Sequence, residues 1–170
     1  MLVSDAQMEV RQVYLGGLIG NTVAGLLWLA SACLAVWHSH NAAIGLLVVG
    51  GFFIYPALSL VLRLLGKPSA VSPTNPFRFL AIQVAFVLPL SMPLVAPVVA
   101  YRAAWFYPAM MLLVGAHYLP FTTLYGMRSF LILAASLIGS ALLIALYGPS
   151  NFSLGGWVGG VILLVFALVG

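Results

Sequence analysis

The sequence predicts an all-α integral membrane protein, a single polytopic helical bundle of about six transmembrane helices. Two observations carry this prediction: 64% of the 170 residues are hydrophobic, and only 5% are charged. A soluble domain carries about 25% charged residues. A soluble fold of this size has no way to hide so much apolar surface. The polar stretches between the apolar runs are too short to form a separate domain.

The expected spans form one domain and are separated by short polar turns. They are predicted at residues 14–37, 42–65, 76–101, 104–125, 129–147 and 154–170. The first five have about the 20 residues that a crossing needs. The last is short and ends without a charged flank at Gly170. We therefore expect the native chain to continue beyond it; partial insertion of this helix is the alternative.

Capping residues indicate where several helices begin. Ser4 and Gln7 have capping-box spacing, which predicts a helix that starts near Asp5 and continues through the interface into the first span. Asn41 is the expected N-cap of the second span. Asn75 precedes a proline, and this pair predicts the start of the third span, because proline is favoured in the first helical turn.

The third span carries prolines at a step of four residues: Pro89, Pro93 and Pro97. A proline has no N–H, so each one leaves the carbonyl four residues earlier without its helical partner. Because residues four apart share a face, the freed carbonyls form a stripe that needs a neighbouring donor, water or a solute. We predict that this span is bent or locally unwound between Ala85 and Pro97.

Small residues recur at helical spacing in the first span, at Gly16, Gly20 and Ala24, and further glycines flank Asn21. Such spacing allows two membrane helices to approach closely. Packing within one chain is the favoured interpretation, and the seam of a homo-oligomer is the alternative. Asn21 in this span and Gln83 in the third are expected to hydrogen-bond between helices.

The basic residues indicate how the chain is oriented. Five of the six are expected at one end of the bundle: Arg11, Arg63, Lys67, Arg78 and Arg128. The other end has Arg102. The positive-inside rule therefore predicts a cytoplasmic N-terminus. The net charge of +4 comes from a few basic residues at the ends of the spans, where they indicate orientation. No nucleic-acid partner is therefore expected.

Several chemistries are disfavoured because the sequence lacks the side chains that they use. The two acidic residues, Asp5 and Glu9, precede the first span, so no carboxylate is expected inside the bundle. This disfavours carriers and metal-dependent membrane enzymes that use buried carboxylates. Motifs for glycoside hydrolysis, phosphate cradling and HExxH zinc chemistry are absent. Cys33, His38 and His40 are too loosely spaced to be more than a weak metal signal, so no metal or cofactor is predicted.

The fourth span supplies most of the candidate site residues. His117 is the one histidine within an expected span, and Pro120 opens the helix beside it. Tyr118, Thr122 and Tyr125 recur at helical spacing and form a polar face. An ionisable residue at membrane depth indicates function by default, with a structural hydrogen bond as an equal alternative. We expect His117 to face the interior, near Tyr118 or Tyr125.

The stretch from Gly115 to Gly126 resembles segments of small bacterial multipass membrane proteins of unknown function. The resemblance implies a polytopic helical protein of the bacterial plasma membrane. It implies no activity, no cofactor and no catalytic residue.

Arg102 completes the candidate site at the turn between the third and fourth spans. Tyr101 and Trp105 flank it, which is typical of an interface anchor; binding a lipid phosphate or an anionic solute is the alternative. The short turn makes the two spans antiparallel neighbours. A solute site between them would be lined by Arg102, Gln83 and the polar face that contains His117.

The sequence favours a transporter or binding protein for a small neutral, anionic or amphiphilic molecule, held between discontinuous helices in the lipid bilayer. The first alternative is a membrane enzyme acting on a lipid-like substrate, with His117 as base and Arg102 as anion binder. The second is a structural or accessory subunit. No catalytic residue is assigned.

Overall fold

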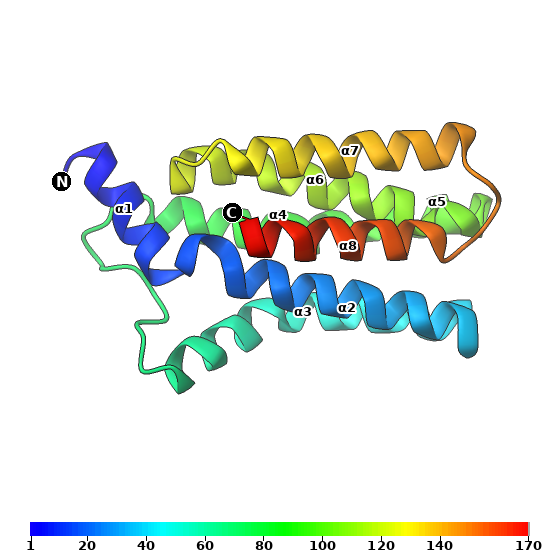
Figure 1. The fold of residues 1–170 in the computed structure, drawn as a ribbon, viewed down its shortest axis with the longest axis horizontal. Helices are drawn as coiled ribbons and strands as arrows, with labels where there is room; N and C mark the ends of the chain where they lie inside the picture. Colours follow the sequence, from blue (N-terminus) through cyan, green and yellow to red (C-terminus); the bar gives the residue numbers. More distant parts are fainter. Residues whose placement is uncertain (170) are drawn as a thin grey trace.

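The computed structural model describes residues 1–169, and in that part of the chain all regular secondary structure is helical. The long helices lie side by side along a common axis (Figure 1). The α-helices are α1 (Val3–Val13), α2 (Leu18–Trp37), α3 (His40–Leu64), α4 (Arg78–Ser91), α5 (Val95–Tyr101), α6 (Phe106–Tyr125), α7 (Ser129–Tyr147) and α8 (Leu154–Val169). Three short 3-10 segments join them: η1 (Leu15–Gly17), η2 (Met92–Leu94) and η3 (Ala103–Trp105). Gly170, the end of the last expected span, lies outside the described residues.

Four helical stretches of residues 1–169 are long and apolar enough to cross a membrane: Leu15–Trp37, His40–Leu64, Arg78–Tyr101 and Ser129–Tyr147. By length and composition they indicate a membrane protein. α6 has 20 residues but carries more polar side chains, and α8 has 16 residues. The count of about six spans therefore stays a prediction.

α6 is the central helix of the bundle. It packs most extensively against α7 and also contacts α1, α4, α5 and α8. Ten of its residues are buried, and Phe106, Tyr107, Met110 and Met111 are almost completely enclosed. The helix with most of the candidate polar residues is therefore shielded by its neighbours.

Small residues bring α2 against α8. A Cβ at Gly25 would lie 2.7 Å from Cγ of Leu164, and a Cβ at Gly159 would lie 2.6 Å from the Trp28 ring. Larger residues at these glycines would separate the helices. Gly25 therefore packs within the chain. Gly20 has no atom within 4 Å of its Cβ position, and a homo-oligomer seam through it stays a prediction.

The expected continuous helix from the N-terminus into the first span is wrong. α1 begins at Val3, and it ends before η1, where Leu15 and Gly17 have φ values of 50° and 93°. Left-handed backbone over this segment cannot continue an α-helix, so α1 and α2 are separate elements. At the other end of α1, Oδ2 of Asp5 accepts a hydrogen bond from the backbone N–H of Leu2 at 3.2 Å.

Two other expected helix starts also differ in detail. α3 begins after Ser39, whose Oγ accepts the Ala42 N–H at 3.2 Å, so the expected cap at Asn41 is wrong. α4 begins at Arg78, two residues after the predicted start. Oδ1 of Asn75 accepts the Phe77 N–H at 2.8 Å and closes the turn that precedes the helix.

The third expected span changes helix type within the interval of its prolines. α4 continues through Pro89, the 3-10 segment η2 follows, and α5 resumes the α-helix. The carbonyl of Pro89 accepts the N–H of Met92. The expected need for an outside donor is therefore wrong at this carbonyl, because a tighter turn supplies the donor from the chain itself. A bend of the helix axis stays a prediction.

The two ends of the bundle lie on opposite sides of the view in Figure 1. α1, the loop between α3 and α4 and the turn between α6 and α7 lie at one end, on the left of the view. The α2–α3 turn, the short α5–α6 connection and the α7–α8 loop lie at the other end. Five of the six basic residues belong to the first end or its helix termini, and Arg102 belongs to the second.

Candidate functional site

An apolar groove lies between α3 and the proline-containing stretch from α4 to α5, and its volume is about 550 Å³. α3 provides one wall, α4, η2 and α5 provide the other, and α6 contributes one aromatic ring. The lining side chains are Ile44, Val48, Phe52, Pro89, Met92, Pro93, Val95, Ala96, Val99, Ala100 and Phe106. We call this space the α3–α5 groove.

Local packing explains why the groove is open. A Cβ at Gly51 would lie 3.0 Å from Cε of Met92, so the flexible end of this methionine side chain packs against α3 at the glycine. Met92 and Phe106 are buried and belong to the inner part of the lining. Ala96 and Ala100 are exposed and have short side chains, which leave the space beside α5 unfilled.

The lining of the groove suits a hydrocarbon chain. None of its eleven side chains carries a charge, a hydroxyl or an amide. These side chains offer no hydrogen bond that would hold a polar solute in place. Inside a bilayer a hydrocarbon ligand gains little hydrophobic free energy, because lipid tails are as apolar as leucine. Shape and van der Waals contact would therefore decide which hydrocarbon chain fits. Any preference for a polar group on the ligand must come from residues outside the groove.

The predicted residues of α6 lie in a different place. The ring of His117 is 5.8 Å from that of Tyr118 and 5.1 Å from that of Phe121, and its Nδ1 is buried without a hydrogen-bond partner among the described residues. Tyr118 is buried, and its hydroxyl donates to Oδ1 of Asn21 on α2 at 2.7 Å. His117 therefore sits in an aromatic packing cluster beside a satisfied interhelical hydrogen bond.

Tyr125 and Thr122 also have structural surroundings. The Tyr125 ring lies 5.5 Å from Phe121 and 4.8 Å from Phe130, and its carbonyl accepts a hydrogen bond from Nε of Arg11. Thr122 donates its hydroxyl proton to the carbonyl of Leu119 at 2.7 Å. The Thr122 hydroxyl thus bonds within its own helix, and the backbone carbonyl of Tyr125 binds α1 at the end of α6.

Arg102 and Gln83 do not join the α6 residues. Gln83 is exposed on α4. Arg102 precedes α6, whereas His117 lies about 16 Å along that helix from its first residue. Among the described residues, no hydrogen bond or ring contact joins Arg102 to His117, and the expected solute site between the third and fourth spans stays a prediction. The groove has its walls on α3 and α4–α5, and α6 contributes Phe106 alone.

Sequence reasoning missed the α3 wall of the groove. Ile44, Val48 and Phe52 are ordinary apolar residues of a membrane span, and no pattern distinguishes them from residues that face lipid. A weak signal was available on the other wall. Ala96 and Ala100 are small residues four apart in the same stretch as the prolines, which places them on one helix face.

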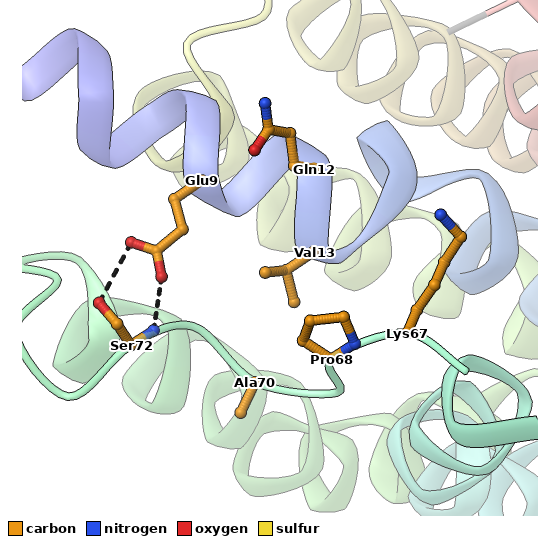
Figure 2. A pocket seen from close by; sticks show the side chains of 7 residues that line it. All are labelled: Glu9, Gln12, Val13, Lys67, Pro68, Ala70 and Ser72. Atoms are coloured by element: carbon orange, nitrogen blue, oxygen red, sulfur yellow. Dashed lines mark hydrogen bonds between the residues drawn. The ribbon is translucent and has the colours of Figure 1, made fainter. Parts of the chain in front are cut away.

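A second hollow, of about 530 Å³, lies between α1 and the loop that follows α3. Figure 2 shows the Glu9 carboxylate turned toward Ser72 at one side, with Lys67 at the other. Glu9 Oε1 accepts the Ser72 N–H at 2.6 Å, and Oε2 accepts from Nδ2 of Asn75 at 2.8 Å. These donors, the Ser72 N–H first, hold the pKa of Glu9 below its ordinary value. Sequence analysis gave this carboxylate no role.

The residues considered for a metal do not gather. Within residues 1–169, no group of three or more histidine, cysteine, aspartate or glutamate residues could hold a metal ion. His40 instead stacks on Phe152, with ring centroids 4.0 Å apart. Neither hollow of the bundle thus presents a set of metal ligands.

The match to known families covers almost the whole chain: the family of unknown function DUF7010 matches residues 3–169. The chain belongs to this family. No curated protein and no solved structure matches it. Membership of DUF7010 agrees with the resemblance to proteins of unknown function, while the bacterial origin stays a prediction. The match to DUF7010 assigns no activity to the chain.

Proposed function

We propose that this protein binds an amphiphilic molecule and holds its hydrocarbon tail in the α3–α5 groove. The observation that carries the proposal is a space of about 550 Å³ lined by apolar side chains alone, on helices that are long enough to cross a membrane. A binding or transport protein for an amphiphile fits this lining better than a carrier of small polar solutes, which needs convergent polar groups.

The membrane setting is part of the proposal. We infer six crossings, formed by α2, α3, α4–α5, α6, α7 and α8, with the N-terminus in the cytoplasm of a bacterial cell. The uneven placement of the basic residues supports this orientation. The groove then lies toward the non-cytoplasmic side, because it includes residues from the start of α3 and from the last part of α5.

Filling the groove tests the proposal directly. Ala96→Phe places a ring in the space beside α5, and the matched control Ala85→Phe places the same ring on an exposed position of α4 outside the lining. The purified protein, in lipid nanodiscs, is photolabelled with a diazirine-bearing phospholipid. We expect labelled peptides from α3 and α5 in the wild type and in the control, and a several-fold loss in Ala96→Phe.

Equal labelling of all three proteins at the groove peptides would contradict the proposal. Thermal unfolding of each variant, followed by circular dichroism, shows whether the substitutions preserve the fold. Because both replaced alanines are exposed, neither ring has to enter the packed core. If Ala96→Phe loses labelling but is as stable as the wild type, the loss is caused by the ring that fills the groove.

A further inference from the structure

The turn between α5 and α6 lies at one end of the α3–α5 groove. Ala100, just before this turn, and Phe106, just after it, both line the groove. The short segment that joins them, which includes η3, therefore lies at the end of the groove by chain continuity. This is also the end of the bundle where Arg102 is found.

Arg102 has unused hydrogen-bonding capacity at this position. It is exposed, its Nη2 donates to Oγ of Ser150 at 2.8 Å, and its Cζ lies 5.4 Å from the centre of the Trp105 ring. A guanidinium group has five N–H donors. Among the described residues, the bond to Ser150 is the one hydrogen bond of the Arg102 guanidinium, so its remaining donors can bind an anion.

The length of the groove matches a single lipid tail. From Pro89 to Ala100 the wall extends about 16 Å along the helix axis, by helical rise. One leaflet provides roughly half of the 30 Å hydrocarbon thickness. A chain that fills the groove thus ends at the depth where a lipid headgroup begins, next to the segment that carries Arg102.

Building on the tail site proposed above, we propose that the ligand is an anionic phospholipid of the leaflet at the Arg102 end. One acyl chain lies in the groove, and the phosphate accepts hydrogen bonds from Arg102. Because the apolar groove cannot distinguish lipid tails strongly, the charge at its end decides which headgroup is held. Trp105 and Ser150 hold the guanidinium in position for this contact.

The test measures headgroup preference rather than total binding. Nanodiscs contain equal trace amounts of diazirine-labelled phosphatidylglycerol or phosphatidylcholine in a phosphatidylcholine background. We expect the wild type to be labelled more by phosphatidylglycerol at the groove peptides. Arg102→Gln should lower this preference roughly threefold, as befits an exposed charge pair. The matched control Arg128→Gln removes an exposed arginine at the opposite end and should leave the preference unchanged.

Two results would overturn the assignment of an intact phospholipid with its phosphate at Arg102 and its tail in the groove. The first is an unchanged preference in Arg102→Gln while Ala96→Phe still loses labelling with both lipids; the tail groove then stands without an anionic headgroup site. The second is full displacement of the label by soluble glycerol phosphate, which would show that the headgroup binds without a tail. By contrast, if Ala96→Phe were labelled as strongly as the wild type, the proposal that the groove holds a lipid tail would be contradicted.

Discussion

At the scale of single residues, the bundle interior depends on a few satisfied polar contacts. Asn21 on α2 and Tyr118 on α6 are both buried and are joined by a 2.7 Å hydrogen bond. Ser31 on α2 similarly contacts the hydroxyl of Tyr107 at 2.6 Å and donates to the carbonyl of Ala43 at 2.8 Å. A buried polar atom that loses its partner destabilises the fold, so these pairs fix how α2 sits on its neighbours.

Tyr118→Phe should test the contact with Asn21. The substitution keeps the ring and removes the donor, which leaves Oδ1 of Asn21 buried and unpaired. We expect the free energy of unfolding to fall by about 1 kcal/mol, the order found for interhelical hydrogen bonds in membranes. Tyr147→Phe is the control, because Tyr147 is 82% exposed. Equal stability of the two variants, measured by denaturant titration in detergent, would show that the hydrogen bond contributes nothing.

His117 illustrates what a residue type alone leaves open. A histidine within a membrane span is a sound candidate for function. Its neighbours here are the rings of Tyr118 and Phe121, which contribute packing rather than an acid, a base or a substrate channel. Those neighbours depend on how α6 is rotated among the other helices, and periodicity along α6 does not specify that rotation.

At the scale of elements, α1 holds one end of the bundle together. Gln7 donates to the carbonyl of Thr123 at 2.8 Å, and Arg11 donates to that of Tyr125. These carbonyls belong to the last turn of α6, where a helix lacks internal donors and where a basic side chain is favourable. On its other side, Glu9 binds the loop after α3 through Ser72 and Asn75. α1 thus connects two segments that are distant in sequence.

The attachment of α1 should depend on pH through Glu9. Its folded-state pKa lies below the ordinary value of 4.5, because the Ser72 N–H and Asn75 bind the ionised form. The stabilisation is therefore fully present above about pH 4.5 and is lost as the pH falls through the depressed pKa. Glu9→Gln should lower the free energy of unfolding by up to about 1 kcal/mol at neutral pH, and the difference from wild type should vanish in acid.

A control separates this effect from general loss of negative charge. Asp5→Asn removes the other carboxylate of α1, whose hydrogen bond to the Leu2 N–H stays within the helix start. Its stability difference from wild type should be smaller, and hydrogen exchange in the loop after α3 should be unchanged. Faster exchange of the Ser72 amide in Glu9→Gln alone is the expected signature. A pH-independent difference for Glu9→Gln would contradict the assigned role.

At the scale of the whole molecule, the proposed orientation can be mapped with single cysteines. In a Cys33→Ala background, Lys67→Cys and Ser150→Cys place one thiol at each end of the bundle, and both original residues are exposed. In intact cells, a membrane-impermeant maleimide should label the cysteine at position 150 and reach position 67 only after lysis. The opposite pattern would invert the orientation, and labelling of both would show that the two ends lie on the same side.

The helical class, an apolar character typical of membrane proteins and most helix positions could be predicted from the sequence. Those features follow from composition, from the length of apolar runs and from polar turns, which are local properties of the chain. The helix break at η1 is also a local feature, but it was not predicted from the sequence. Leu15 adopts a left-handed backbone conformation there, which is uncommon for leucine. The start of α3 at Ser39 rather than Asn41 was decided by a hydroxyl that reaches the Ala42 N–H.

The location of the α3–α5 groove depends on how the helices pack against one another. The proline stretch was recognised from its spacing, but its partner is α3, and Gly51 meets Met92 across that contact. All the apolar spans have similar hydrophobic patterns. The pattern of a span therefore does not distinguish residues that line a groove from residues that face lipid. Arg102 and His117 belong to consecutive expected spans, but they lie at different depths of the bundle. Arg102 precedes α6, and His117 lies in the second half of that helix. Neighbours in sequence share a site only when helix rotation and depth agree, and packing of the whole bundle fixes both.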